Sequence, residues 1–175
     1  MIDFPRPLLG FSAFSGTGKT TLLKQLLPIL KQQGLRIAVI KHASHDFDID
    51  RPGKDSYELR MAGASPMLIA SRRRMALVVE FDRAEEEPTL DQLLPCLDPS
   101  NIDLLLIEGF KQADIMKIEL HRPSLGKPLL CTNDPRIIAV ATDAEIPAAP
   151  VTLPRLDIND PMAIAGFILQ QVITI

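Results

Sequence analysis

The stretch AFSGTGKT, residues 13–20, decides the fold expected for this 175-residue chain. It follows an apolar run, RPLLGFSA (6–13), and precedes a leucine-rich run with helical spacing, TTLLKQLLPILKQQ (20–33). Its pattern is Gly, four residues, then Gly-Lys-Ser/Thr, with Ala13 in place of the first glycine. A loop that joins a strand to a helix in this way aims consecutive backbone N–H groups at an anion. The stretch therefore predicts a phosphate-binding loop (P-loop, Walker A motif).

Individual residues of this loop have expected roles toward a nucleotide. Gly16 and Gly18 allow left-handed backbone angles and a close approach to phosphate oxygens. Lys19 would reach the β- and γ-phosphates, and the Thr20 hydroxyl would bind Mg²⁺. The plain alternative is a glycine-rich turn with a surface lysine, and the strand-to-helix context argues against it.

The rest of the chain alternates short apolar runs with helical patterns. Further strands are expected at 35–42, 102–110 and 136–142, and helices at 56–62, at 90–97 and from Pro161 onward with Asp160 as the cap. Two β-like runs at 65–81, separated by an arginine-rich turn, predict a β-hairpin. The pattern predicts one α/β domain over 1–175, with a doubly wound, mainly parallel sheet flanked by helices. Its ligand should lie beyond the carboxyl ends of the strands.

The composition argues against several classes of protein. A formal charge of −3 and a pI near 5.6 give no general attraction to nucleic acid. The sequence holds no uncharged apolar run of about 18 residues and no secretory signal pattern, so we expect a cytoplasmic, non-membrane protein. The two cysteines, Cys96 and Cys131, form no CxxC pair and indicate neither a disulfide framework nor a thiolate metal site.

Two further residues are candidates for the chemistry at the phosphates. Glu108 ends the apolar run LLLIE (104–108), where a P-loop protein needs a carboxylate for its Mg²⁺, bound directly or through water. The alternative is that Glu108 is simply a charged residue at the end of a strand, without a role toward a metal. Lys41 lies at the carboxyl end of the expected strand 35–42, where a cation near the γ-phosphate would help catalysis.

The loop after residue 42 contains three alternating carboxylates. Asp46, Asp48 and Asp50 share one face of an extended chain, which resembles the start of a calcium loop. The sixth position is Arg51 rather than Gly and the twelfth is Tyr57 rather than Glu, so an EF-hand is rejected. We expect one of the three aspartates near the metal and take Asp46 as the candidate.

Three stretches together resemble the molybdopterin-guanine dinucleotide biosynthesis protein B (MobB) family: AFSGTGKTTLLKQL (13–26), VIKHASHDFDIDRPGKDSYELRMAGA (39–64) and LLLIEGFK (104–111). The resemblance covers roughly residues 8–120, with weaker similarity at 137–143 and 156–161. It implies a homodimeric P-loop protein that binds GTP and Mg²⁺ and hydrolyses GTP weakly. It also implies an accessory role beside the guanylyltransferase MobA, which attaches guanosine monophosphate to molybdopterin.

The resemblance also implies roles for particular residues. The nucleotide contacts fall on Ser15, Gly16, Thr17, Gly18, Lys19, Thr20 and Thr21, and a metal-associated role falls on Glu108. Asp143 is a candidate guanine reader, because a carboxylate accepts hydrogen bonds from N1–H and N2–H₂ of the base. The sequence holds no Asn-Lys-x-Asp motif, so a guanine preference is implied by the resemblance alone.

Alternatives from the enzyme class remain open at this point. An ATP-dependent small-molecule kinase or a dethiobiotin-synthetase-like ligase would also place a lysine at position 41 and the sequence EGF after a central strand, and Arg72–Arg74 could clamp an anion. A nickel-delivery GTPase would need a Cys/His cluster that this sequence lacks. For the homodimer, the hairpin at 65–81 is the expected contact, because exposed strand edges can pair across a twofold axis.

Overall fold

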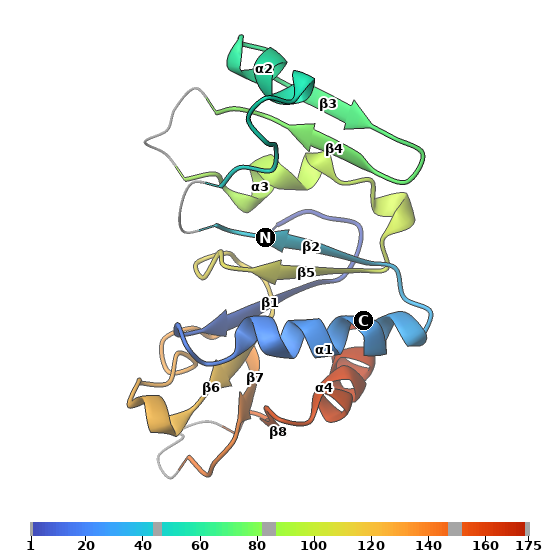
Figure 1. Cartoon of the computed structure of the whole chain (residues 1–175). Coiled ribbons are helices and arrows are strands. Elements are labelled where there is room, and N and C mark those ends of the chain that lie inside the picture. The colour runs from blue at the N-terminus through green and yellow to red at the C-terminus, as the bar shows by residue number, and fades with distance from the viewer. Residues whose placement is uncertain (1, 44–46, 82–86, 147–151, 174–175) are drawn as a thin grey trace. The chain divides into compact units, whose positions relative to one another are not determined.

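The computed structural model describes residues 2–43, 47–81, 87–146 and 152–173 (Figure 1). Its contacts divide the chain into two compact units. The large unit consists of Met1–His42 and Thr89–Ile175, and the small unit of Ala43–Pro88. The sequence-based expectation of one domain over 1–175 stays a prediction.

The large unit is built on a six-stranded sheet in the order β2-β5-β1-β6-β7-β8. Its strands are β1 (Leu8–Ala13), β2 (Ile37–Lys41), β5 (Leu104–Glu108), β6 (Lys117–His121), β7 (Ile137–Thr142) and β8 (Arg155–Asp157). Every neighbouring pair is parallel. The predicted parallel α/β fold is thus confirmed, and the strands end along one edge.

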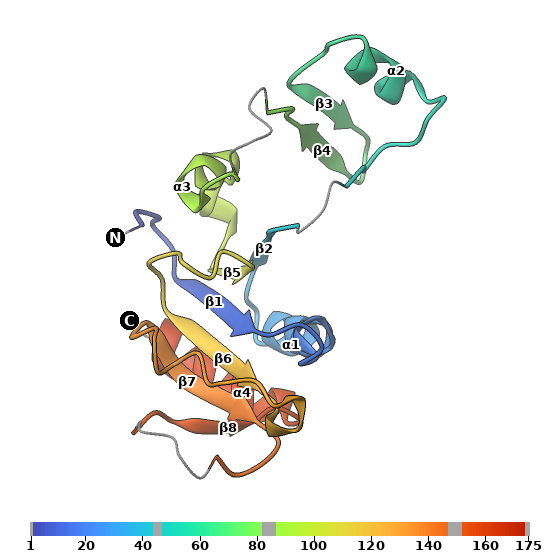
Figure 2. The same ribbon diagram turned by 90° about the vertical axis from the view of Figure 1, so that its left-hand side faces the viewer.

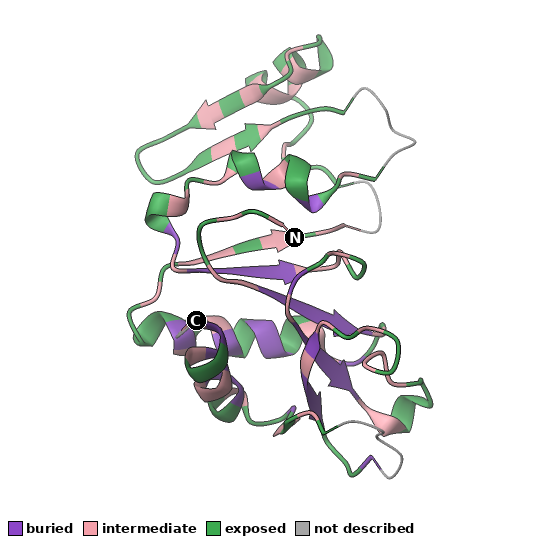
Figure 3. Ribbon diagram, turned by 180° about the vertical axis from the view of Figure 1, so that it is seen from behind, coloured by how far each residue is buried: buried purple, intermediate pink, exposed green. Residues whose placement is uncertain are grey.

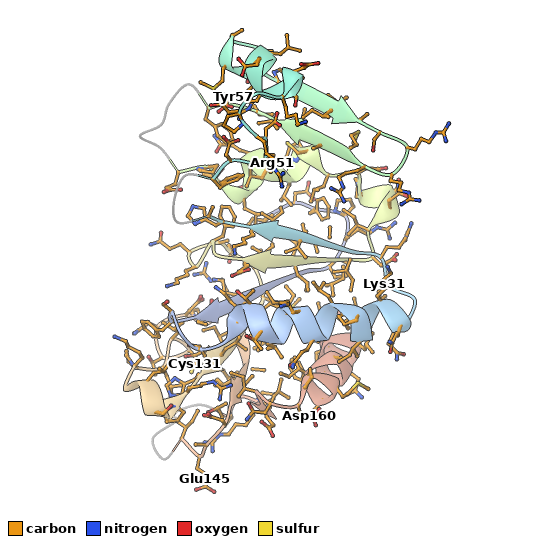
Figure 4. All side chains as sticks on the ribbon, in the orientation of Figure 1. Lys31, Arg51, Tyr57, Cys131, Glu145 and Asp160 are labelled. Carbon is orange, nitrogen blue, oxygen red and sulfur yellow. The ribbon has the colours of Figure 1, made fainter. Side chains whose placement is uncertain are left out.

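Helices cover both faces of this sheet. On one face lie α1 (Lys19–Gln32) and α4 (Pro161–Ile168), which contact each other (Figure 2). On the other face lie α3 (Leu90–Leu93) and the 3₁₀ turn that follows it. The predicted cap of α4 is confirmed, since the Asp160 carboxylate (labelled in Figure 4) accepts a hydrogen bond from the Ala163 N–H at 2.9 Å.

Strand β5 supplies side chains to the core on both faces of the sheet. Leu104 and Leu106 pack with α1 and α4, and Leu105 and Ile107 pack with the residues around α3. All four are at most 1% exposed (Figure 3). Because successive side chains of a strand point to opposite faces, a continuous apolar run is what a doubly covered strand requires.

Strand β6 is the main element that the sequence patterns did not predict. Its sequence, KIELH, carries a charged or polar residue at every second position, which suggests an exposed face, yet all five residues are buried. The Lys117 ammonium is bound by the Asp134 carboxylate at 2.7 Å and by the Lys111 carbonyl at 2.8 Å. The two oxygens of Glu119 accept from the backbone N–H groups of Leu130 and Cys131. Each buried charge thus has its partners, which is what permits its burial.

The surroundings of these buried groups also shift the pKa values of Asp134 and Cys131. Burial works to raise the pKa of Asp134, but hydrogen bonds from Lys117 and Arg136 outweigh it and lower that pKa to about 2. Burial, followed by the nearby Glu119 carboxylate, raises the pKa of the Cys131 thiol to about 11. Cys131 is therefore a neutral thiol rather than a reactive thiolate at neutral pH.

The small unit contains α2 (Asp55–Met61) and an antiparallel hairpin of β3 (Met67–Ala70) and β4 (Met75–Val78). The hairpin predicted at 65–81 is thus confirmed. Within the described part of this unit no residue is fully buried. Arg60 holds the unit together: its guanidinium binds Glu80 at 2.6 Å and Asp48 at 2.7 Å, and it lies over the Tyr57 ring.

Candidate nucleotide-binding site

The P-loop connects the end of β1 to the start of α1, as the sequence predicts. Gly18 precedes the helix with φ 96°, a left-handed conformation that favours glycine. The backbone N–H and the hydroxyl of Thr17 both donate to the Phe14 carbonyl, at 3.3 and 2.7 Å, and close the loop. The first-turn N–H groups of a helix have no carbonyl partner within it, and α1 has no acidic residue there to attract them. The loop therefore keeps a positive pole for an anion.

The predicted phosphate contacts differ in their exposure. Ser15, Gly16, Thr20 and Thr21 are exposed, Gly18 and Lys19 are half-buried, and Thr17 is buried. The Thr17 hydroxyl, which donates to the Phe14 carbonyl, helps to hold the loop in this shape.

On one side of the loop, Lys19 meets Glu108. The Lys19 ammonium lies 3.4 Å from a Glu108 carboxylate oxygen, and these side chains are 20% and 12% exposed. Glu108 is in register with Phe11 of β1 and with Lys41 of β2. Side chains in register share a face of the sheet, so these residues lie on the face that α1 covers. The structure thus brings Lys19, Lys41 and Glu108 to one edge, which we call the β5 side.

Gly109 fixes the backbone beside Glu108. Its φ is 107°, and a Cβ added to it would lie 2.3 Å from the Cβ of His42. The His42 N–H donates to the Glu108 carbonyl at 2.8 Å, and its ring packs against Phe110. The ends of β2 and β5 can lie this close only because residue 109 lacks a side chain.

On the other side of the loop, which we call the β6–β8 side, there is a hollow with a volume of about 450 Å³. The P-loop and the first turns of α1, including Thr21 and Gln25, line it on one side. Arg122, Ile158 and Asn159 line it on the other.

Arg122 joins three strand ends to the P-loop. Its Nε–H donates to the Thr17 carbonyl at 2.9 Å. Its Nη1 donates to a carboxylate oxygen of Asp143, and its Nη2 to the amide oxygen of Asn159 at 3.2 Å. The sequence singled out Asp143 only. It missed Arg122 because the strand before that residue was not predicted, and Asn159 because β8 is too short to give a pattern.

The residues present suit a nucleotide-bound Mg²⁺ better than a metal held by protein alone. Among the described residues, no group of three or more His, Cys, Asp or Glu side chains could hold a metal ion. Mg²⁺ is usually bound by one or two carboxylates together with phosphates and water. Thr20, exposed at the start of α1, and Glu108 are the groups available for such an ion.

The three loop aspartates are not shown at this site. Asp46 lies outside the described residues. Asp48 is bound to Arg60 within the small unit. A hydrogen bond from Ser56, with help from the Arg51 N–H, lowers the pKa of Asp50. The described aspartates therefore stabilise loops, and the role of Asp46 stays a prediction.

No helix formed by the described residues is long and apolar enough to cross a membrane.

Comparison with known proteins gives a consistent set of similarities. The family model described as "MobB: Molybdopterin guanine dinucleotide synthesis protein B" matches residues 8–143. The chain is 48% identical over 165 residues to the molybdopterin-guanine dinucleotide biosynthesis adapter protein of Escherichia coli (strain K12), covering 94% of this chain and 92% of that one. It is 42% identical over 164 residues to the protein of the same name from Haemophilus influenzae, covering 93% and 87%. A crystal structure of molybdopterin-guanine biosynthesis protein B (mobB) superposes with a TM-score of 0.71 at 29% identity, covering 93% and 97%.

Proposed function

The chain belongs to the MobB family, and from that premise we propose that it is a nucleotide-dependent adapter protein of molybdopterin guanine dinucleotide biosynthesis. It binds GTP and Mg²⁺ at the P-loop and hydrolyses GTP slowly. It acts in the cytoplasm beside the guanylyltransferase MobA, which joins guanosine monophosphate to molybdopterin.

The observation that carries the nucleotide part of the proposal is the meeting of Lys19 and Glu108 at the mouth of the loop, 3.4 Å apart. A triphosphate that enters the loop offers Lys19 stronger partners than one carboxylate, because charge-assisted hydrogen bonds to phosphate are among the strongest in proteins. Glu108 is then free to hold Mg²⁺ directly or through water. Mg²⁺ would neutralise charge on the β- and γ-phosphates.

We expect slow hydrolysis because the polar side chains around the P-loop are divided between its β5 side and its β6–β8 side. The β5 side supplies two cations and a carboxylate, but fast hydrolysis also needs a group that orients the attacking water. Gln25 lines the hollow on the β6–β8 side and not the edge where Glu108 lies. We expect a partner to supply the missing group, as activating proteins do for other P-loop proteins.

Titration calorimetry with GTP and with ATP, with and without Mg²⁺, tests this proposal, together with phosphate release from the same samples. We expect GTP to bind more tightly and release to be far slower than the enzyme median of about 10 per second. Added MobA should change the rate. A clear ATP preference with rapid transfer to a small acceptor would instead support the kinase or ligase alternative.

We also propose that the chain is a homodimer that pairs through the hairpin of the small unit. Leu68 and Leu77 are cross-strand partners, 57% and 46% exposed, and with Met75 they form one apolar face. Apolar faces of this kind mark interaction sites, and a second copy would cover it with an identical face. Val78 is half-buried on the opposite face and is a poorer probe.

Leu68→Glu should therefore give monomers by size-exclusion chromatography with light scattering. Arg73→Glu, a charge change at the exposed hairpin turn, is the matched control and should leave the dimer intact. An unchanged mass for the Leu68 variant would rule out this interface.

A further inference from the structure

The β6–β8 side carries a polar constellation that the proposed phosphate chemistry does not use. We propose that Asn159 and Asp143, oriented by Arg122, read the guanine base. This inference rests on the proposed function, since it assumes a triphosphate in the P-loop. It supplies the specificity that the absent Asn-Lys-x-Asp motif leaves unexplained.

The position of the hollow supports a nucleoside there. It touches the P-loop at Gly16 and Gly18 and then follows α1 through Thr21 to Gln25. Glu108 and Lys41 are not among the residues that line it. Asp143 does not line it either, but it is bound to Arg122, which does. If the γ-phosphate lies on the β5 side with its metal, the nucleoside end extends into this hollow. Its volume of about 450 Å³ falls within the range of small-molecule sites, roughly 300–1,000 Å³.

The hydrogen bonds of Arg122 determine which polar atoms remain for a ligand. A guanidinium has five N–H donors, and three bind Thr17, Asp143 and Asn159. Because Asn159 directs its amide oxygen to Arg122, its NH₂ group is left to donate. Asp143 binds Arg122 through Oδ2, and Oδ1 keeps its capacity to accept. The constellation therefore offers a donor beside an acceptor.

This arrangement is complementary to guanine and not to adenine. Guanine presents the O6 acceptor beside the N1–H and N2–H₂ donors, so Asn159 can donate to O6 while Asp143 accepts from N1–H and N2–H₂. Adenine presents N6–H₂ in the place of O6 and a lone pair at N1, which sets donor against donor and acceptor against acceptor. A site built to hydrogen-bond one base rejects the mismatched base, and we expect discrimination of about a hundredfold.

Arg122 is a positioning residue in this scheme. It fixes the orientation of the Asn159 amide and holds Asp143 beside it, and its bond to the Thr17 carbonyl ties both to the P-loop. The base-reading groups and the phosphate cradle thus share one rigid connection. Such preorganisation is what makes a hydrogen-bonding site selective.

Asp143→Asn gives a decisive test, because it should change the preferred base rather than merely weaken binding. Xanthine carries an oxygen at C2 where guanine carries N2–H₂, and an asparagine can donate to that oxygen. We expect affinity for GTP to fall about a hundredfold and affinity for xanthosine triphosphate to rise at least tenfold, measured by calorimetry with Mg²⁺. Affinity for inorganic tripolyphosphate, which has no base, should stay within about threefold.

Asn159→Ala and Arg122→Ala test the other two residues of the proposed base-reading site. Both should lower the ratio of GTP to ATP affinity about tenfold or more, and both should still bind tripolyphosphate, which confirms a folded P-loop. Arg155→Ala is the matched control, since Arg155 lies at the start of β8 and its side chain bonds only to the Ile146 carbonyl among the contacts described. It should leave the ratio unchanged.

The outcomes separate the two proposals. If the wild-type chain binds GTP, ATP and tripolyphosphate equally well, the base-reading proposal is overturned and P-loop nucleotide binding stands. If Asp143→Asn weakens GTP without any gain for xanthosine triphosphate, base reading by Asp143 is likewise overturned. If the wild type binds no triphosphate, the proposed function itself fails.

Discussion

The two sides of the P-loop obtain their functional groups in different ways. On the β5 side, Lys19 and Glu108 lie at the ends of strongly patterned elements, and their positions follow from backbone pairing between strands. On the β6–β8 side, Arg122, Asp143 and Asn159 each follow a separate strand and are held by hydrogen bonds between their side chains. The first arrangement depends on backbone geometry, whereas the second depends on a side-chain network.

This difference predicts different consequences of mutation. Substitutions on the β5 side should affect every triphosphate alike, because phosphates and Mg²⁺ are common to all of them. Substitutions on the β6–β8 side should alter which nucleotide binds.

Lys19→Ala should abolish triphosphate binding, with an expected loss on the order of a thousandfold, about 4 kcal/mol. It removes the cation that faces the phosphates while leaving α1 intact. GTP, ATP and tripolyphosphate should lose affinity equally in calorimetry. Lys24→Ala, at an exposed position of the same helix, is the control and should bind normally. If the Lys19 variant kept its affinity for triphosphates, the proposal that the P-loop binds the nucleotide would be wrong.

Gly109→Ala should destabilise the large unit by about 3 kcal/mol, because the new methyl group meets His42 and the positive φ is strained. Gly166→Ala is the contrasting change: an added Cβ there meets no atom within 4 Å, and the residue lies inside α4. It should stabilise by about 0.5–1 kcal/mol. Chemical denaturation measures both. Equal effects of the two changes would show that the close approach of β2 and β5 is not required.

Glu108→Gln should lower Mg²⁺-dependent GTP hydrolysis by roughly thirtyfold, about 2 kcal/mol, since it removes the charge but keeps the shape. GTP affinity without Mg²⁺ should not fall, because Lys19 loses a competing carboxylate. Asp103→Asn, where the carboxylate pairs with Arg36 at the opposite end of the same strand, is the control and should hydrolyse normally. Unchanged Mg²⁺ dependence in the Glu108 variant would contradict its role as the metal carboxylate.

Asp134→Asn should destabilise the protein at pH 7 by about 1–2 kcal/mol, allowing for solvent screening. The folded pKa of Asp134 is lowered from 3.8 to about 2, so its stabilising contribution is complete above about pH 4 and is lost as the pH falls toward 2. Urea unfolding between pH 7 and pH 2.5 should show the variant and the wild type converging at the acid end. A difference that stays constant with pH would mean that the ion pair with Lys117 is not its source.

Local sequence patterns predicted much of the molecule because they reflect local physics. The P-loop needs glycines and a lysine at fixed spacing, and β5 needs an apolar residue at each of its four buried positions. The hairpin needs two β-like runs around a polar turn. Strand β6 did not follow its local pattern, because the Lys117 ammonium is paired with the Asp134 carboxylate and the Glu119 carboxylate accepts hydrogen bonds from the backbone N–H groups of Leu130 and Cys131. Hydrophobic periodicity cannot report a partner that lies many residues away.

The sequence by itself determined the family, the parallel α/β architecture and the phosphate cradle, because each depends on residues that are close together in the chain. Only the tertiary structure decided that Glu108 meets Lys19, that charged β6 is a buried central strand, and that Arg122 joins Asp143 and Asn159 to the P-loop. These contacts join residues from separate strands. Strand order and register decide them, and both are set by the packing of the whole sheet.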